Sequence, residues 1–542
     1  MKVAADHWTI PHPARALSTV ARAFRAPADT TRQVLEEARL RIRGYAAAGI
    51  SRETMGWTTT PDNADSLVRR ELRTLRARSR EQAASNDYAR RYVSLLQSNV
   101  VGAHGLKLDS QVADPDGTAD VQARKGIESA WRAWGEAEPD VTGRLSWLEI
   151  ERQGIRTAAV DGEILLRFRE GREAGPWGFQ VQVLDPELLD VELNQRLSDG
   201  GAIRQGVEVD AWGKPRAYHL LQVPRGAAPE LMDAATARKH RRVPADEILH
   251  AFLPEWVGQA RGLPWMATAL KRLRMLGGYE EAALTHARVG AMSLGFLRKE
   301  PGAEGFRGDT KSARNDGSTE LNLEPGEFNT LPTGVSLETY DPRYPSGEFA
   351  PFSNHILKGI SAGLGPAYTS LSQNLEGTSY AGGRMGLLEE RELYRALQTW
   401  YAGQVHRHVF RRWLKWALLM DRVTHPVTGS PFPSSRLDKF REHRWQGKRW
   451  PWVDPRNDAQ AAELMVKAGL TTESKVIREL GDDPTEVWEE RRLELEERRK
   501  RGLTTSTDSA PAPDAPAPRA AEDDDTDPDE PLVAPRNPGG QQ

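Results

Sequence analysis

At 542 residues the chain exceeds the size at which a single hydrophobic core usually stops growing, so we expect two or more packed units. It contains no cysteine, which excludes disulfides, thiol catalysis and thiolate metal sites. No apolar run approaches the roughly 20 residues that cross a bilayer, and the N-terminus lacks the apolar stretch of a secretory signal. We therefore expect no membrane partner.

The net charge of −3 is unevenly distributed. The segment 504–542 carries nine acidic residues and two arginines, a charge of −7, which leaves +4 on the rest of the chain. A body this weakly basic does not indicate sequence-specific DNA binding, but it suits a surface that touches DNA without gripping it. The Pro, Ala and Asp composition of 503–542 predicts a disordered acidic tail.

The first half of the chain reads as helices followed by strands. Residues 1–30 are expected to be mobile, and helical spacing of apolar residues predicts one or two helices over 65–101 and another over 118–136. The arginines between Arg69 and Arg80 are expected at the surface or in subunit contacts. From Ile164 to Phe252, alternating apolar and polar residues between turn signals predict an antiparallel β unit.

The second half returns to helices. Pro264 is placed to open a helix that runs to about residue 294. A turn-rich stretch with strand candidates at 295–299, 319–323 and 328–332 separates it from a helix over 352–364, which Gly365-Pro366 ends. A Gly/Ser/Asn loop, a long helix over 384–421 and three helices at 460–469, 474–481 and 485–500 follow. The fold class expected is α+β.

Several local motifs occur in an order that resembles one family. They are RSREQAASNDYARRYVSLLQSNVVG (78–102), VDGEILLRFR (160–169), QVLDPELLDV (182–191), IRQGVEVDAWGKPRAYHL (203–220), VPADEILHAF (243–252), GQARGLPWMATALKRLRMLGGYEEAAL (258–284), NLEGTSYAGGRMGLLEERELYRALQ (374–398) and PWVDPRNDAQAAEL (451–464). Each motif alone is weak, but the ordered set over about 40–480 resembles the lambda-like family of portal proteins of tailed bacteriophages.

The resemblance implies a portal fold and its division. It implies a wing over 31–263, a first stem helix over 264–294, a clip over 295–350, a second stem helix over 351–365, a tunnel loop over 366–383, a long spine helix over 384–421 and a wing return with crown-like helices over 422–502. Members of this family are ring-shaped channels at the unique capsid vertex, through which the genome is packaged and ejected. Packaging requires DNA to slide, which favours sequence-independent phosphate contacts.

The same resemblance implies the partners and the location. The partners are further copies in a homododecameric ring, double-stranded DNA, the terminase large subunit, head-completion or adaptor proteins, and the major capsid and scaffolding proteins. The location is the portal vertex of the virion, and the host cytoplasm during assembly. It implies a structural protein with no catalytic residue, no metal and no cofactor.

Two sets of residues are candidates for the channel. The tunnel loop offers neutral polar groups that could brush the DNA backbone: Ser370, Ser372, Gln373, Asn374, Thr378 and Ser379. The alternative is an ordinary surface loop between two helices. On the first stem helix, Lys271, Arg272 and Arg274 could point into the channel, or form a solvated outer face or salt bridges between subunits.

Two alternative functions are weighed against the portal. Residues 359–363 match the G-x-S-x-G pattern of a serine hydrolase with Ser361 as nucleophile, but the preceding residues are helical in pattern where the elbow needs a strand. Another virion component, such as a minor head or adaptor protein, is the second alternative. His406 and His408 are two residues apart, which places them on different sides of a helix and disfavours a metal pair. Trp400, Trp413 and Trp416 are expected in the core or in subunit contacts.

Overall fold

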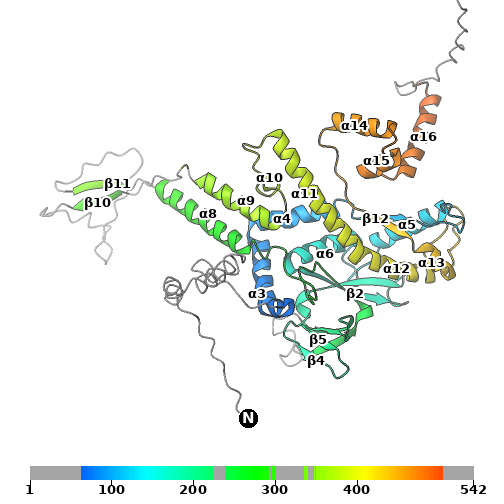
Figure 1. Cartoon of the computed structure of the whole chain (residues 1–542), viewed down its shortest axis with the longest axis horizontal. Coiled ribbons are helices and arrows are strands. Elements are labelled where there is room, and N and C mark those ends of the chain that lie inside the picture. The colour runs from blue at the N-terminus through cyan, green and yellow to red at the C-terminus, as the bar shows by residue number, and fades with distance from the viewer. Residues whose placement is uncertain are drawn as a thin grey trace, which may run out of the picture.

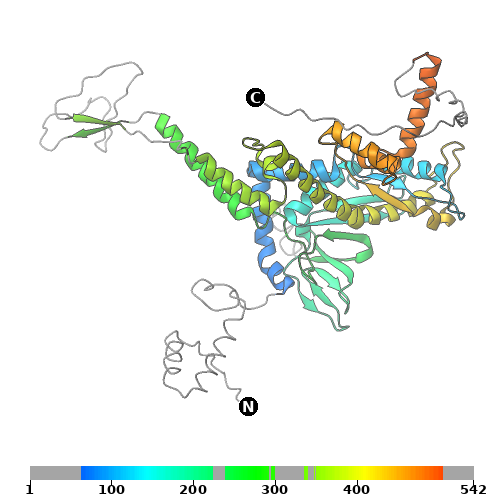
Figure 2. The same ribbon diagram turned by 45° about the horizontal axis from the view of Figure 1, so that its top comes forward.

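The computed structural model describes residues 63–223, 239–291, 295–299, 335–339, 347 and 349–503. Within these ranges, helices and two main antiparallel sheets form a body from which a pair of long helices projects to one side (Figure 1; Figure 2). This arrangement confirms the expected α+β class.

Two helices open the body, α3 (Ala64–Ser85) and α4 (Asp87–Leu96), and the π-helical turn η2 (Gln97–Val101) extends the second. The side chain of Asn63 caps α3 by accepting a hydrogen bond from the Ser66 amide at 2.7 Å. Asn86 ends α3 and caps α4, because its Oδ1 accepts from the amides of Tyr88 and Ala89 at 3.0 and 3.1 Å. The helical zone predicted over 65–101 is confirmed, with its break at Asn86.

Helices α5 (Val121–Glu136) and α6 (Trp147–Asp161) follow. The sequence predicted α5 but not α6. Helix α6 begins with a capping box, in which Ser146 Oγ accepts from the Glu149 amide and Glu149 Oε2 accepts from the Ser146 amide at 2.7 Å. It ends at Gly162, whose positive φ of 91° turns the chain into the first strand of the β unit.

The antiparallel β unit predicted from Ile164 onward is confirmed as two sheets. The first has the order β3-β2-β9, with strands β2 (Glu163–Glu170), β3 (Phe179–Leu184) and β9 (Ile248–Phe252). The second has the order β4-β5-β6-β7-β8, with strands β4 (Gln195–Arg196), β5 (Ala202–Arg204), β6 (Val207–Val209), β7 (Pro215–Leu221) and β8 (His240–Pro244). A small core between them includes Leu165, Val207 and Tyr218, so the sheets share buried apolar side chains.

The projecting pair consists of α8 (Leu270–Ala291) and α9 (Phe349–Leu364), and the antiparallel strands β10 (Gly295–Lys299) and β11 (Val335–Thr339) lie beyond its far end (Figure 2). Helix α8 starts six residues after Pro264, because the intervening residues form tighter turns such as Ala267 N to Pro264 O at 3.0 Å. The strand predicted at 295–299 is confirmed. Those at 319–323 and 328–332 lie outside the described residues.

After Gly365, whose φ is 101°, the chain forms the short helix α10 (Tyr368–Ser372) and then α11 (Tyr380–Tyr401), the π-helical turn η6 (Ala402–His406) and α12 (Arg407–Leu419). The segment expected as a loop over 366–383 therefore contains the short helix α10 and the first residues of α11. Ser379 caps α11 by accepting from the Gly382 amide at 3.1 Å, which draws Gly382 and Gly383 into the helix. The long helix predicted over 384–421 exists, with η6 inside it.

The main core is rich in tryptophan. Trp131 of α5 lies 4.8 Å from Trp134 and 5.0 Å from Trp413 of α12 between ring centroids. Trp147 of α6 joins them at 5.6 Å from Trp131. Strand β1 (Lys107–Ser110) pairs with β12 (His443–Gln446) along the edge of this core, and the short helix α13 (Leu437–Phe440) packs there through Phe440. The prediction that Trp413 packs in the core is confirmed.

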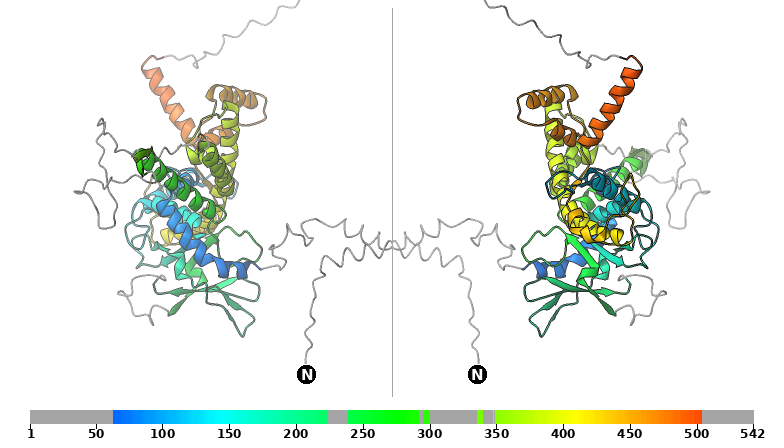
Figure 3. Two further views of the ribbon diagram at one scale, coloured as in Figure 1. Left: turned by 90° about the vertical axis from the view of Figure 1, so that its left-hand side faces the viewer. Right: turned by 90° about the vertical axis from the view of Figure 1, so that its right-hand side faces the viewer.

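Three helices end the described chain: α14 (Pro455–Lys467), α15 (Glu473–Leu480) and α16 (Pro484–Lys500). The side chains of Asp454, Thr472 and Asp483 cap their N-termini. These helices lie at the end of the body opposite the five-stranded sheet (Figure 3). All three were predicted, and each begins within a few residues of the expected position.

Candidate functional site

The loop between α9 and α11 lies at the base of the projecting helix pair. Of its six candidate residues, three are half-buried and hydrogen-bonded within the protein. Ser370 Oγ donates to Glu390 Oε2 at 2.6 Å, and Ser372 Oγ donates to the Tyr368 carbonyl at 2.7 Å. Asn374 Oδ1 accepts from the Glu376 amide at 2.9 Å. These contacts stabilise the shape of the loop.

The exposed part of the loop is the run 375–382. Among the candidates, Gln373, Thr378 and Ser379 are exposed, and Gln373 takes a left-handed conformation with φ of 59° that ends α10. The sequence interpretation missed Leu375 and Tyr380, which are apolar and largely exposed. The loop tip is therefore a mixture of hydroxyl and apolar groups, and its one charged side chain is Glu376.

The three candidate cations of α8 do not form one row. Arg274 pairs with Glu81 of α3 at 2.9 Å, and both side chains are exposed. Arg272 lies across the partner helix α9 at Gly359, where a Cβ would overlap its guanidinium. Lys271 and Arg274 both line a groove of about 450 Å³ between α3 and α8, together with Met275. Arg272 thus approaches α9, whereas Lys271 and Arg274 approach α3.

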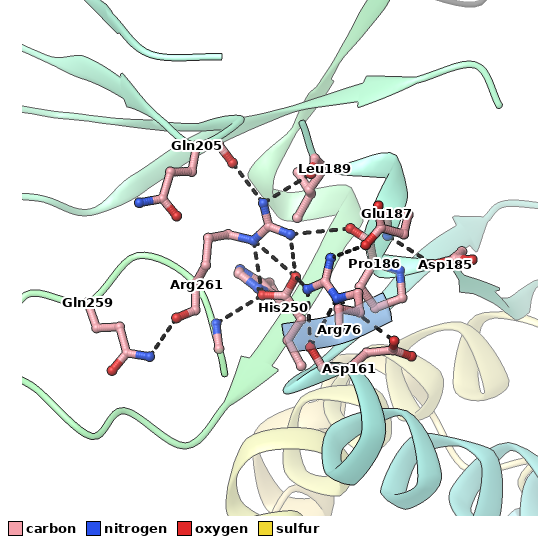
Figure 4. A network of polar contacts seen from close by, with 12 residues as sticks. Arg76, Asp161, Asp185, Pro186, Glu187, Leu189, Gln205, His250, Gln259 and Arg261 are labelled. Atoms are coloured by element: carbon pink, nitrogen blue, oxygen red, sulfur yellow. Dashed lines mark hydrogen bonds and ion pairs between the residues drawn. The ribbon is translucent and has the colours of Figure 1, made fainter. Parts of the chain in front are cut away.

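A buried network of charged residues joins α3, the β unit and the segment before α8 (Figure 4). Arg261, which lies shortly before α8, donates from Nε to both oxygens of Glu163 at 3.0 Å. Its Nη1 also donates to the carbonyls of Leu189 and Gln205 at 3.1 and 2.9 Å. Burial alone would raise the pKa of Glu163, but Arg261, His250 and Arg76 hold it well below its ordinary value.

Arg76 corrects one expectation. The arginines between Arg69 and Arg80 were expected at the surface or in subunit contacts, but Arg76 is buried and pairs with Glu163 and Glu187, each at 2.9 Å. Arg80 is half-buried and pairs with Asp161 and with Asp185. Both arginines tie α3 to the β unit, because a buried guanidinium needs anionic partners from whichever element lies opposite.

The serine hydrolase hypothesis is wrong. Ser361 lies inside α9 and is buried, and its Oγ donates to the carbonyl of Pro366. A nucleophile elbow holds its serine exposed on a turn between a strand and a helix, which is a different geometry.

The described residues contain no group of three or more His, Asp and Glu side chains that could hold a metal ion. In the same part of the chain, no helix is long and apolar enough to cross a membrane.

Comparisons with known proteins identify the family. A family model described as phage portal protein, lambda family, matches residues 51–398. A probable portal protein of Halomonas phage phiHAP-1 is 32% identical over 450 residues, which are 82% of this chain and 85% of that protein. The chain belongs to the lambda family of phage portal proteins. Its function is that of a structural portal protein at the capsid vertex, and it is not an enzyme.

Other portal relatives and solved structures are more distant. Portal protein B of Escherichia phage lambda is 22% identical over 500 residues, 85% of this chain and 92% of that protein. A chain from the neck of a native gene transfer agent particle is 14% identical with a TM-score of 0.39, covering 78% of this chain and 94% of that chain. A chain from the neck of an empty particle has 15% identity and a TM-score of 0.41, covering 76% and 95%.

Proposed function

We propose that about twelve copies of this chain form a ring around a channel, and that double-stranded DNA slides through this channel without its sequence being read. The observation that carries the proposal is the projecting pair α8–α9, which has the loop 366–383 at its base and β10–β11 beyond its far end. A helix pair that leaves the body in this way can line a tube when it is repeated around an axis.

One side of this helix pair packs against the rest of the same chain. Leu273 and Leu276 of α8 and Leu357 and Ile360 of α9 are buried in the main core. Further out, the ring of Tyr279 stacks on Phe349 at 5.4 Å between centroids. The two helices therefore hold each other along their length.

Two large apolar side chains of α8 are left exposed, Met275 at 64% and Leu284 at 60%. They are nine residues apart and therefore lie on opposite sides of the helix. Exposed apolar side chains mark surfaces that contact another chain, and a ring gives each subunit a neighbour on two sides. A neighbouring copy alongside each pair is the partner that a ring supplies.

The loop is the proposed contact with DNA. Its candidate residues Ser370, Ser372, Gln373, Asn374, Thr378 and Ser379 are uncharged, whereas α8 and α9 together carry five Lys and Arg residues and two Glu residues. Because phosphate affinity rises with each neutralising cation, a loop without Lys or Arg lets the duplex slide. Lys271, Arg272 and Arg274 are proposed as weaker channel contacts or as contacts between subunits.

The remaining partners follow from the family. We propose that the β10–β11 end meets the terminase large subunit during packaging and an adaptor protein afterwards. The major capsid and scaffolding proteins would surround the body, and the ring would assemble in the host cytoplasm.

The test is the size and shape of the purified full-length protein. A ring of twelve subunits of 60.3 kDa has a mass of about 720 kDa and a central hole in negative-stain images. Replacing Met275 and Leu284 by Glu should leave monomers, because charge is placed in the subunit contact. The control Trp212→Glu changes a 95% exposed side chain of the second sheet's turn and should leave rings intact. A parent that stays monomeric at micromolar concentration contradicts the proposal.

A further inference from the structure

Helix α12 has two very different faces. One face is buried in the tryptophan core through Val409, Phe410, Trp413 and Leu414. From Arg407 to Lys415, the exposed residues of the opposite face are all basic: Arg407, His408, Arg411 and Lys415. Since several contacts between aromatic side chains hold the buried face in the core, the basic face is fixed in position.

Three of these residues form a row, which we call the α12 row: Arg407, Arg411 and Lys415. They are four residues apart, so their side chains lie on one face of the helix over roughly 12 Å. Like charges at this spacing repel each other. None of the three has an ion pair among the described residues, whereas the half-buried Arg412 beside them pairs with Glu170 at 2.6 Å.

The surroundings of the row are also positive. Burial lowers the pKa of His408, and Arg407, Arg411 and Arg412 lower it further. His443 on the adjacent strand β12 behaves in the same way, because burial and then Arg411 and Arg407 outweigh the nearby Glu442 and a bond to the Arg441 carbonyl. The row is thus a local excess of cations that the described residues do not neutralise.

Helix α16 gives the contrast within the same chain. It also carries many arginines, and Arg492 and Arg498 within it and Arg501 just after it pair with glutamates three or four residues away. Arg492 lies 2.7 and 2.5 Å from Glu489 and Glu496, Arg498 lies 2.7 Å from Glu494, and Arg501 lies 2.9 Å from Glu497. Helix α16 is a solvated, self-neutralised helix. Because the three residues of the α12 row lack such pairs, we expect them to bind an anion from outside the described residues.

We infer that the α12 row binds the phosphates of double-stranded DNA at a surface separate from the loop between α9 and α11. The inference rests on the proposed function, which brings DNA to this protein. A duplex is a continuous line of negative charge, one per roughly 1.7 Å of its axis, and a fixed row of cations matches such a line better than it matches a single carboxylate. Guanidinium groups also bind phosphate oxygens in pairs. A ring would repeat the row in every subunit.

The experiment compares two triple variants of the full-length protein. The row variant carries Arg407→Gln, Arg411→Gln and Lys415→Gln. The control carries Arg492→Gln, Arg498→Gln and Arg501→Gln, and so loses the same number of positive charges from α16. Binding of a fluorescent random-sequence 30-base-pair duplex is measured by anisotropy over a range of salt concentrations, and ring formation is checked by negative stain.

We expect the row variant to lose about tenfold or more in affinity at moderate salt, and its salt slope to fall by about three, because each phosphate contact contributes about 0.9. The α16 variant should bind like the parent, and both should form rings. Equal binding by both variants overturns the inference. If the row variant loses rings but still binds DNA, the row contacts a neighbouring copy. If the protein binds the duplex only in a third variant that lacks 504–542, the row contacts the acidic tail. Either result also overturns the inference. Failure of the proposed function is distinct, since the parent itself would then form no rings.

Discussion

Arg261 holds both carboxylate oxygens of Glu163, with Nε 3.0 Å from each, and neither side chain has any exposed surface. This pair joins the segment before α8 to the first strand of the β unit. The segment that leads into α8 is therefore held to the β unit by a buried charge pair, and the stability of this junction depends on keeping both partners.

Replacing Arg261 by Met should lower the free energy of unfolding by about 3–5 kcal/mol, because it leaves the carboxylate of Glu163 buried with fewer cations around it. The measurement is urea unfolding followed by tryptophan fluorescence. As a matched control, Arg216→Met removes a guanidinium whose pair with Asp199 is exposed, and it should cost less than about 1 kcal/mol. Equal losses in the two variants would contradict this account.

Glu128 should make the protein less stable as the pH rises. Burial raises the pKa of Glu128 to about 7, with Asp109 and other acidic residues adding to it and the Ser110 amide opposing it. Between its ordinary value of 4.5 and about 7, the folded protein holds more protons than the unfolded chain, so unfolding becomes easier with increasing pH.

Glu128→Gln should remove this dependence. The variant should melt at a higher temperature than the parent at pH 8 and at a similar temperature at pH 5, since its amide oxygen can still accept from Ser110. Glu376→Gln makes the same charge change at an exposed loop position and serves as the control. A difference between Glu128→Gln and the parent that is the same at both pH values would argue against the raised pKa.

Gly162 should not tolerate a side chain. Its φ is 91°, and a Cβ there would overlap the backbone of Leu263. Gly213 has a similar φ of 83° with open space around it. Gly213→Ala should therefore cost about 1 kcal/mol for the left-handed conformation alone, and Gly162→Ala several kcal/mol more. Comparing the two unfolding midpoints separates overlap from backbone strain. Similar midpoints would mean that the chain around Leu263 can move aside.

Trp413→Ala should destabilise the protein by about 3–5 kcal/mol, because it opens a cavity among Trp131, Trp134 and Phe410. Trp212→Ala, at an exposed turn, should change the unfolding free energy by no more than about 0.5 kcal/mol. Thermal unfolding monitored by circular dichroism measures both. A loss in Trp413→Ala as small as that in Trp212→Ala would contradict the assignment of these rings to the core.

Features set by nearby residues could be predicted from the sequence. Helix starts at Thr472 and Asp483 and the stop at Gly365-Pro366 depend on caps and turns a few residues long. Helix α6 carries such a signal as well, the capping box of Ser146 and Glu149, although a pattern of apolar residues alone does not reveal it. The β unit could be predicted because apolar and polar residues alternate along its short strands.

Features set by distant residues could not be predicted. Arg76 continues the buried row of Val68 and Leu72, but Glu163, which makes its burial possible, lies 87 residues further along the chain. The sequence placed Lys271, Arg272 and Arg274 on one helix, yet only the positions of α3 and α9 decide where each one lies. Residues that line a channel depend on further copies, which no single chain contains.

The π-helical turn η6 sets the rotation of everything after it. A π turn holds one more residue than an α turn, so the side chains after it lie about 100° behind the positions that a regular α-helix of the same length would give them. Buried positions then step evenly by four from Tyr401 through Val405 to Val409. If the same sequence formed a regular α-helix over Ala402–His406, α12 would be turned by about 100° on its axis and its arginines would move towards the tryptophans. Deleting one residue from Ala402–His406 would instead give a regular helix with α12 facing the same way. The π turn thus accommodates one additional residue and keeps the basic side of α12 exposed to solvent.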